Sequence, residues 1–189
     1  MKYRIYGLVG AASLTLYATF VALADERELQ PRPMEEMHGD CSNFHWDMSQ
    51  EFEVWKEKAA EITAGKSAEE PPALALSTRY TVTLAPHEDV AFVVAPEKDR
   101  GGSDKFSGLL RVEIPEDGLY RISASNGLWI DALVDGKTVK SNSFEMQTGC
   151  DTIFKSVAYS FTGGEIVTFQ LNGSRSPQVD IAVTASPDQ

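Results

Sequence analysis

The chain of 189 residues carries 28 Asp and Glu residues against 17 Lys and Arg residues, which gives a formal net charge of −11 at pH 7. An excess of carboxylates disfavours binding to nucleic acids and to anionic membrane surfaces, because both are polyanions. The sequence therefore predicts neither as a partner, and its length fits one domain with a hydrophobic core.

Residues 1–24 have the three parts of a secretory signal peptide. A basic start at Lys2 and Arg4 precedes an apolar stretch over residues 5–21, and Ala22-Leu23-Ala24 supplies a small-residue cleavage site. We expect cleavage after Ala24 and a periplasmic or secreted product that makes no membrane contact. The alternative is an uncleaved anchor, since an apolar run of about 17 to 20 residues could just span a bilayer.

Residues 25–42 are predicted to form a disordered acidic lead, because they combine prolines and many charges with almost no apolar periodicity. Cys41, near its end, and Cys150 are the only cysteines. In an oxidising compartment such a pair favours a disulfide, which would pin the N-terminal segment to the rest of the protein. Zinc binding is the weaker alternative, since the spacing of His38 and His45 around Cys41 matches no common closed zinc site.

Apolar residues then recur at steps of three and four, which predicts an amphipathic helix over residues 43–65. Asp47 and Gln50 offer a start that resembles a capping box, and Gly65 offers a stop. The apolar stripe consists of Phe44, Met48, Phe52, Trp55, Ala59 and Ile62. Because the stripe includes large aromatic rings, we expect it to dock on the domain that follows.

After a polar linker over residues 66–72, the apolar period changes to two, which predicts strands with one buried face. The alternations fall at residues 80–84, 90–94, 110–114, 120–124, 129–134, 153–161, 166–171 and 179–184. Asp135-Gly136 favours a two-residue hairpin turn, and Gly163-Gly164 a second tight turn. Eight or nine short strands without intervening helices predict a mainly β protein: an antiparallel, jelly-roll-like β-sandwich over residues 73–186 with the N-terminal helix packed on it.

The strand over residues 129–134 carries the first candidate binding site. Its alternate residues belong to the core, so Trp129, Asp131 and Leu133 are expected to point away from it. A Trp beside a carboxylate on an outer sheet face is typical of a sugar platform, because rings stack on pyranoses and carboxylates accept hydrogen bonds from hydroxyls. The alternative is that Trp129 and Leu133 receive the stripe of the N-terminal helix.

Metal sites and catalytic constellations are weakly represented. Three histidines offer no iron-ligand set, no serine lies in a Gly-x-Ser-x-Gly turn, and no cofactor is predicted. Glu97, Asp99 and Asp104 in a Gly-rich segment are weak calcium-ligand candidates without EF-hand spacing, and a plain mobile loop is the alternative. Asp47 and Glu51, four residues apart, are better explained as a polar helix face than as glycosidase acids.

Several fold-level motifs carry a resemblance to known proteins. They are residues 41–51 (CSNFHWDMSQE), 108–111 (GLLR), 118–121 (GLYR), 128–131 (LWID), Cys150 and Lys155. These stretches resemble a group of uncharacterised exported proteobacterial β-sandwich proteins, whose members often carry the name homogentisate 1,2-dioxygenase. The Gly-Leu-Tyr-Arg-Ile pattern is also similar to small jelly-roll modules of secreted hydrolases. The resemblance implies an exported sandwich, while no iron-ligand set lies on the matching positions.

Together these features predict an exported, non-catalytic binding or accessory module for a glycan or an envelope protein partner. A structural subunit of an envelope assembly is the alternative, and a metal-dependent oxygenase or hydrolase is less favoured. A Trp129 exposed beside Asp131 would favour the glycan binder, and a large apolar patch would favour a protein partner.

Overall fold

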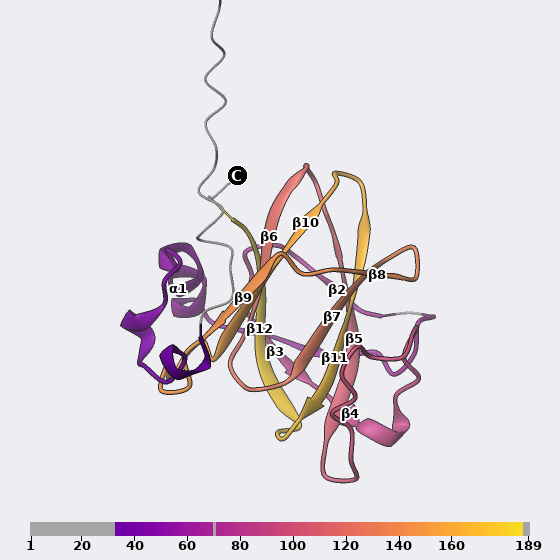
Figure 1. Cartoon of the computed structure of the whole chain (residues 1–189). Coiled ribbons are helices and arrows are strands. Elements are labelled where there is room, and N and C mark those ends of the chain that lie inside the picture. The colour runs from indigo at the N-terminus through magenta and orange to yellow at the C-terminus, as the bar shows by residue number, and fades with distance from the viewer. Residues whose placement is uncertain (1–32, 70, 187–189) are drawn as a thin grey trace, which may run out of the picture.

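The computed structural model describes residues 33–69 and 71–186, so the predicted signal peptide, its cleavage site and residues 25–32 lie outside the described residues. Two β-sheets pack face to face, and one short helix lies against the outside of one of them (Figure 1). The prediction of a mainly β fold compatible with a sandwich is confirmed. No helix among the described residues is long and apolar enough to cross a membrane.

The first sheet contains six strands in the spatial order β1-β3-β12-β6-β10-β9. Their bounds are β1 Ala60–Thr63, β3 Tyr80–Thr83, β6 Gly118–Ala124, β9 Ser143–Met146, β10 Lys155–Phe161 and β12 Gln178–Ala185. Neighbouring strands are antiparallel except for β1 and β3.

The second sheet has the order β2-β5-β11-β7-β8, with β4 paired beside β5. Its strands are β2 Ala73–Leu74, β4 Ala85–Pro86, β5 Phe106–Glu113, β7 Trp129–Val134, β8 Lys137–Val139 and β11 Ile166–Ser174. Here β2 and β5 run parallel. The sheets are therefore mixed: most pairs are antiparallel, as the prediction of an antiparallel sandwich has it, and one edge pair of each sheet is parallel. Between β1 and β3 the chain crosses to the other sheet to form β2, and such a crossover returns a strand in the parallel direction.

The β7–β8 hairpin confirms the predicted two-residue turn, because Asp135 and Gly136 have φ values of 50° and 71°. Residues 90–94, in contrast, form no strand. After a short 3-10 helix (His87–Asp89) they begin a covering loop, residues 90–105, that runs over the outer face of the second sheet. The Gln170 side-chain oxygen accepts hydrogen bonds from the backbone N–H groups of Val93 (2.7 Å) and Val94 (3.2 Å). A side chain of β11 thus satisfies donors that a strand neighbour would otherwise take.

Alternate residues of both sheets fill the space between them with one large apolar cluster. At its centre four aromatic rings lie 5.7 to 6.4 Å apart between centroids: Tyr120, Tyr159, Phe161 and Phe169. Separations of this size suit offset or edge-to-face packing. The core therefore fixes β6, β10 and β11, the strands from whose ends the candidate site is built.

The helix α1 spans Ser49–Lys56, so the predicted helix over residues 43–65 is wrong at both ends. Before it, the Glu145 carboxylate accepts hydrogen bonds from the backbone of His45 and Trp46, which holds that segment in a non-helical path. After it, residues 60–63 pair with β3 as β1. Long-range hydrogen bonds thus override a local helical pattern.

The apolar side of this N-terminal segment covers the outer face of the first sheet. Trp46, Met48, Val54 and Trp55 form a second cluster with residues that include Leu119, Ile153, Ala158 and Ala182. Glu51, predicted to lie on a polar helix face, is instead fully buried there. Its Oε1 accepts a hydrogen bond from Thr184 (2.8 Å) and lies 3.6 Å from Nη1 of Arg121. A buried carboxylate requires such partners.

The described half of the predicted disordered lead, residues 33–42, is ordered, so that prediction is wrong there. Met37 is 1% exposed, and its carbonyl oxygen accepts a hydrogen bond from the Thr148 N–H. The disulfide between Cys41 and Cys150 is present, as predicted, and ties this segment to the connection between β9 and β10. The composition of the segment predicted disorder, because composition does not reveal contacts with residues that lie more than a hundred positions away in the sequence.

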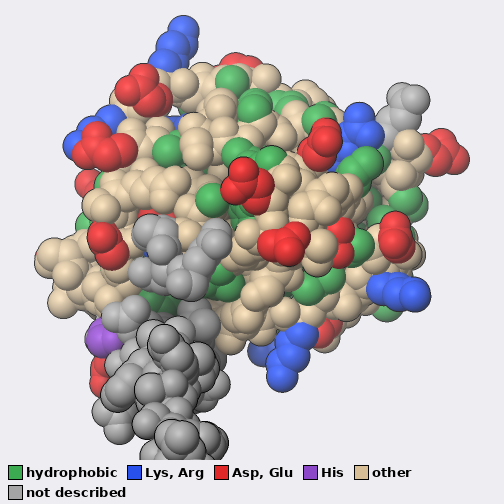
Figure 2. Space-filling model, turned by 90° about the horizontal axis from the view of Figure 1, so that it is seen from above, with side chains coloured by type: hydrophobic (Ala, Val, Ile, Leu, Met, Phe, Trp, Pro, Cys, Tyr) green, Lys and Arg blue, Asp and Glu red, His purple; other side chains and the backbone are tan. Residues whose placement is uncertain are grey.

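Acidic side chains are spread over one end of the sandwich, where β6 begins and β10 ends. Figure 2 looks onto this end, and Asp and Glu side chains are more prominent there than Lys and Arg side chains. The opposite end, where β6 ends and β10 begins, carries basic side chains such as Arg100 and Lys105 together with the neighbouring acids Asp99 and Asp104.

Candidate functional site

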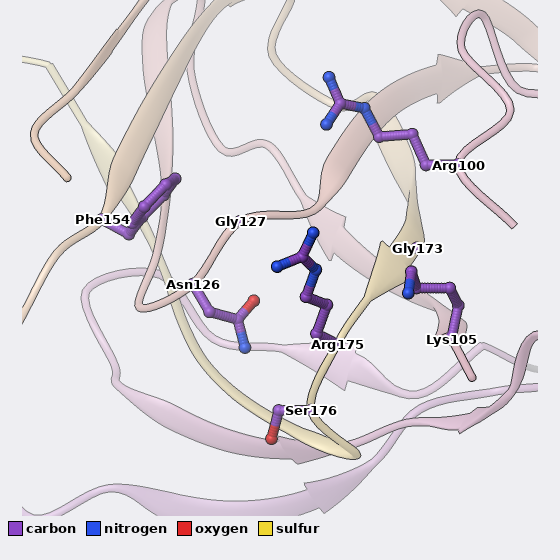
Figure 3. A pocket seen from close by; sticks show the side chains of 8 residues that line it. All are labelled: Arg100, Lys105, Asn126, Gly127, Phe154, Gly173, Arg175 and Ser176. Atoms are coloured by element: carbon purple, nitrogen blue, oxygen red, sulfur yellow. The ribbon is translucent and has the colours of Figure 1, made fainter. Parts of the chain in front are cut away.

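A basic cleft of about 520 Å³ lies at this opposite end of the sandwich (Figure 3). Its lining residues come from the covering loop, the β6–β7 connection, the residue before β10, and the end of β11 with the turn after it. They are Arg100, Lys105, Asn126, Gly127, Phe154, Gly173, Arg175 and Ser176. Loops gathered at one end of a rigid sandwich are a common location for binding sites.

Three lining side chains of the basic cleft are cationic. Lys105 donates a hydrogen bond of 2.6 Å to Asp104, and this contact lowers the pKa of the Asp104 carboxyl. Among residues 33–69 and 71–186, no carboxylate lies within ion-pair distance of Arg100 or Arg175. Unpaired guanidinium groups in a cleft attract anions, since carboxylates and phosphates match their planar geometry.

Gly173 allows the covering loop to approach β11 closely. Its φ of +78° favours glycine, and a Cβ at this position would lie 2.5 Å from both the Cβ and the carbonyl oxygen of Arg100. Beside it, the Asn172 amide donates a hydrogen bond of 2.8 Å to the Lys98 carbonyl. These contacts hold the loop against the sheet and fix the backbone of Arg100, whose side chain is exposed.

Neutral polar and aromatic groups complete the basic cleft. In Figure 3, Asn126 and Phe154 lie across the cleft from Arg100 and Lys105, with Arg175 between them. Asn126 donates through Nδ2 to the Gln178 carbonyl, while its Oδ1 has no hydrogen-bond partner among the described residues. The cleft therefore combines cations, an amide side chain whose Oδ1 is buried from solvent, and a ring surface.

The structure corrects the Asp131 half of the sugar platform predicted at Trp129 and Asp131, while Trp129 stays partly exposed. Asp131 lies on the outer face of β7 but is only 3% exposed, because the covering loop lies over it. Its oxygens accept hydrogen bonds from Trp129 Nε1 (2.7 Å) and from the Glu97 N–H (3.3 Å), and burial raises the pKa of its carboxyl. The alternative, in which Trp129 and Leu133 receive the apolar stripe of the N-terminal helix, is also wrong. The helix α1 packs on the first sheet, whereas Trp129 and Leu133 belong to the second sheet, on the face that the covering loop contacts.

Three cations surround the Trp129 ring instead. The Lys98 Nζ, Lys155 Nζ and Arg100 Cζ atoms lie 4.8, 5.6 and 5.8 Å from its centroid. Lys155 donates a hydrogen bond of 3.1 Å to the Leu128 carbonyl. Burial, with a further contribution from the charges of Arg100 and Lys98, lowers the pKa of Lys155 to about 8. We call these three cations and the ring the tryptophan subsite.

Sequence reasoning missed the basic residues of both sites. The acids of the run EKDRGG, residues 97–102, suggest a calcium loop, whereas its Lys98 and Arg100 are the residues that contribute to the two sites. Arg175 follows Gly173-Ser174 in a turn, and a basic residue in a turn is too common to predict a site. The one available signal was the presence of several cations around glycines in a strongly acidic chain.

The acidic calcium candidates do not converge on one point. The Asp99 carboxylate accepts a hydrogen bond from the Gly101 N–H (2.8 Å) and Asp104 pairs with Lys105, while Glu97 is linked to Asp131 through its backbone. Within the described ranges, the groups spaced closely enough for a metal ion are confined to Cys41, Cys150 and Asp151. Both sulfurs of that group form the disulfide, so they offer no thiolate.

No protein-family model and no curated protein matches this sequence. Among solved structures, the chain is similar to a β-glucosidase from Paenibacillus barengoltzii, with 14% sequence identity and a TM-score of 0.27 over 66% of this chain. The match covers 13% of that enzyme's chain. A likeness at this level carries no argument about function, and the resemblance to exported proteobacterial sandwich proteins stays a prediction.

Proposed function

We propose that this chain is an exported, non-catalytic binding module whose ligand is an anionic glycan held in the basic cleft. The observation that carries the proposal is the pair of guanidinium groups, Arg100 and Arg175, in a cleft of about 520 Å³ without carboxylate partners among the described residues. A guanidinium can bind a carboxylate through two parallel hydrogen bonds, which gives both affinity and orientation.

The neutral part of the cleft supports a sugar as the carrier of that negative charge. The Phe154 ring offers an apolar surface for the face of a pyranose, and Asn126 lies beside it in the lining of the cleft. Ser176 adds a hydroxyl at the margin. A small inorganic anion would use the guanidinium groups but would leave the ring without a contact.

We give the protein no catalytic role in this proposal. None of the eight residues that line the cleft is an Asp or a Glu, whereas glycoside hydrolysis commonly needs two acids that flank the bond. The cleft can bind a charged sugar without supplying the groups that would cleave it.

The proposed location is the periplasm or the exterior of the cell. Residues 1–24 have the pattern of a secretory signal peptide, and the Cys41–Cys150 disulfide suits an oxidising compartment. Acidic glycans of the cell envelope are available in that location, so the proposed ligand is consistent with the proposed compartment.

Calorimetric titration of the exported, oxidised protein with glucuronic acid, galacturonic acid and neutral galactose tests this proposal. We expect the two acids to bind and galactose to bind at least tenfold more weakly, because galactose leaves the guanidinium groups unpaired. Arg175→Gln should weaken acid binding at least tenfold. Arg111→Gln, an equal charge change on the exposed side of β5, serves as the control.

Equal binding of galactose and the acids, or an unaffected Arg175→Gln variant, would refute the anionic-glycan proposal. If no sugar binds but an envelope protein is retained through Arg175, the alternative of a protein partner replaces it. The Arg111→Gln control separates either result from a general loss of positive charge.

A further inference from the structure

We infer that the ligand is an oligosaccharide with several carboxylate-bearing sugars, which runs from the basic cleft onto the tryptophan subsite formed by Trp129 with Lys98, Arg100 and Lys155. This inference rests on the proposed function of the cleft and extends it by a second position for a charged sugar.

The cleft and the tryptophan subsite adjoin along two strands. Gly127 and Phe154 line the cleft, whereas Trp129 and Lys155 line a smaller cavity of about 60 Å³. Trp129 follows Gly127 by two positions in the chain, and Lys155 directly follows Phe154. Two residues of an extended chain cover about 7 Å. Arg100 lines the cleft and also lies 5.8 Å from the Trp129 ring centroid. One ligand of modest length can therefore contact both positions.

Three cations lie around the Trp129 ring, whereas two carboxylates, those of Glu97 and Asp131, line the adjoining cavity. Within residues 33–69 and 71–186, Lys98, Arg100 and Lys155 have no carboxylate at ion-pair distance. The buried carboxylate of Asp131 already accepts two hydrogen bonds from Trp129 and the Glu97 backbone. Cations that crowd one ring repel each other, and an anion among them relieves that repulsion.

The two positions repeat one combination of groups, which argues for a ligand that repeats as well. In the cleft, the Phe154 ring lies with Arg175 and Lys105, and in the subsite the Trp129 ring lies with Lys98 and Lys155. A chain of acidic sugars presents an apolar ring face and a carboxylate at each unit. A polyphosphate presents the charges alone and would leave both rings unused.

The direct test compares galacturonic acid, digalacturonate, tetragalacturonate and tetraphosphate by calorimetric titration against the exported, oxidised protein. We expect tetragalacturonate to bind at least tenfold more tightly than the single sugar. Lys98→Gln should remove most of this gain while leaving the affinity for galacturonic acid unchanged. Lys98 is exposed, so the variant is expected to fold, and Lys137→Gln in β8 is the matched control.

The possible results separate this inference from the proposed function. Equal affinities for galacturonic acid and tetragalacturonate, with both dependent on Arg175, would overturn the tryptophan subsite and leave the cleft intact. A Lys98→Gln variant that matches Lys137→Gln would do the same. Tetraphosphate binding as tight as tetragalacturonate would refute the sugar-chain component. If no acidic sugar binds, the proposed function fails with the inference.

Proton uptake gives a second readout at Lys155. The charged groups around this lysine are Arg100, Lys98, Asp131 and Glu97, and the Tyr159 hydroxyl shares its cavity. Because the pKa of Lys155 is about 8, an added carboxylate should raise it, so binding at pH 8 should take up protons. Titrations in buffers of different ionisation enthalpy should show this uptake for tetragalacturonate and lose it in Lys155→Gln. Equal heats in all buffers would refute the contact with Lys155.

Discussion

Arg121 is a large, fully buried side chain on the outer face of β6, although arginine is among the residues least often found inside proteins. Its Nη1 donates a hydrogen bond of 2.8 Å to the Asp47 carbonyl and lies 3.6 Å from Glu51 Oε1. The guanidinium also lies 4.8 Å from the Trp46 ring centroid. One residue of the sheet thus links three residues of the N-terminal segment.

Replacement of Arg121 by Leu should destabilise the protein strongly. The change leaves the Glu51 carboxylate buried without its cation, and an uncompensated buried charge costs about 3 to 5 kcal/mol. Arg111→Leu, at an exposed position of the second sheet, should change the unfolding free energy by no more than about 0.5 kcal/mol. Urea denaturation at pH 7 measures both. Similar midpoints for the two variants would show that the buried pair contributes little.

The lowered pKa of Lys155 predicts a pH dependence of stability. Its pKa is about 8 in the folded protein, against about 10.4 in an unfolded chain. Between these values the unfolded state binds more protons, so the contribution of Lys155 to the unfolding free energy should rise as pH increases from about 8 to 10.4. Lys155→Met should flatten this rise and stabilise the protein at pH 7 by up to about 3 kcal/mol. Denaturation of both proteins at several pH values provides the check, and parallel curves would contradict it.

At the scale of elements, the described residues before β1 belong to no sheet and are held by side-chain contacts, by backbone hydrogen bonds from Thr148 and Gly149, and by the disulfide. The cysteines lie 109 residues apart, so the bridge closes a long loop in the unfolded chain. Replacing both cysteines by serine should lower the unfolding free energy by about 2 to 5 kcal/mol. Denaturant unfolding of the oxidised protein and the double variant measures the difference. A loss below about 0.5 kcal/mol would mean that the docked segment holds without its bridge.

The same elements show why local patterns predict some structure and miss the rest. Alternation predicted β7 and its Asp135-Gly136 turn because burial and turn chemistry there act within a few residues. Residues 90–94 alternate equally well, yet Gln170, about eighty positions later, holds them as part of a loop. The helical period of residues 60–63 is likewise overridden by pairing with β3. Long-range hydrogen bonds determine the structure of both segments, and these bonds cannot be predicted from the local spacing of apolar residues.

For the whole molecule, the sandwich followed from the sequence and the basic cleft did not. Strand number and apolar period fix the layers, because every strand must bury one face. The cleft instead joins Arg100, Asn126, Phe154 and Arg175, which come from four segments far apart in the chain. The predicted Trp129 lies beside it, but the predicted partner Asp131 serves to hold Trp129 and the covering loop.

The net negative charge of the molecule predicts how salt changes the two rate constants of ligand binding. At distances beyond the cleft, a polyanionic sugar meets a protein of net charge −11. This repulsion reaches far at low salt, where the Debye length is about 30 Å at 0.01 M, and is screened at about 10 Å in 0.1 M salt. The association rate of tetragalacturonate should therefore rise, or stay constant, as salt increases. The dissociation rate should also rise, because salt weakens the contacts with Arg100 and Arg175.

Stopped-flow binding at 0.01, 0.1 and 0.3 M NaCl separates these two effects. A Glu116→Gln, Asp117→Asn variant neutralises two exposed acids in the turn before β6, at the end remote from the cleft. It should associate faster than the unmodified protein at the lowest salt and equally fast at the highest, with an unchanged dissociation rate. An association rate that falls steeply with salt would mean that the local field of Lys98, Arg100 and Arg175 reaches beyond the acidic surface and itself steers the ligand to the cleft.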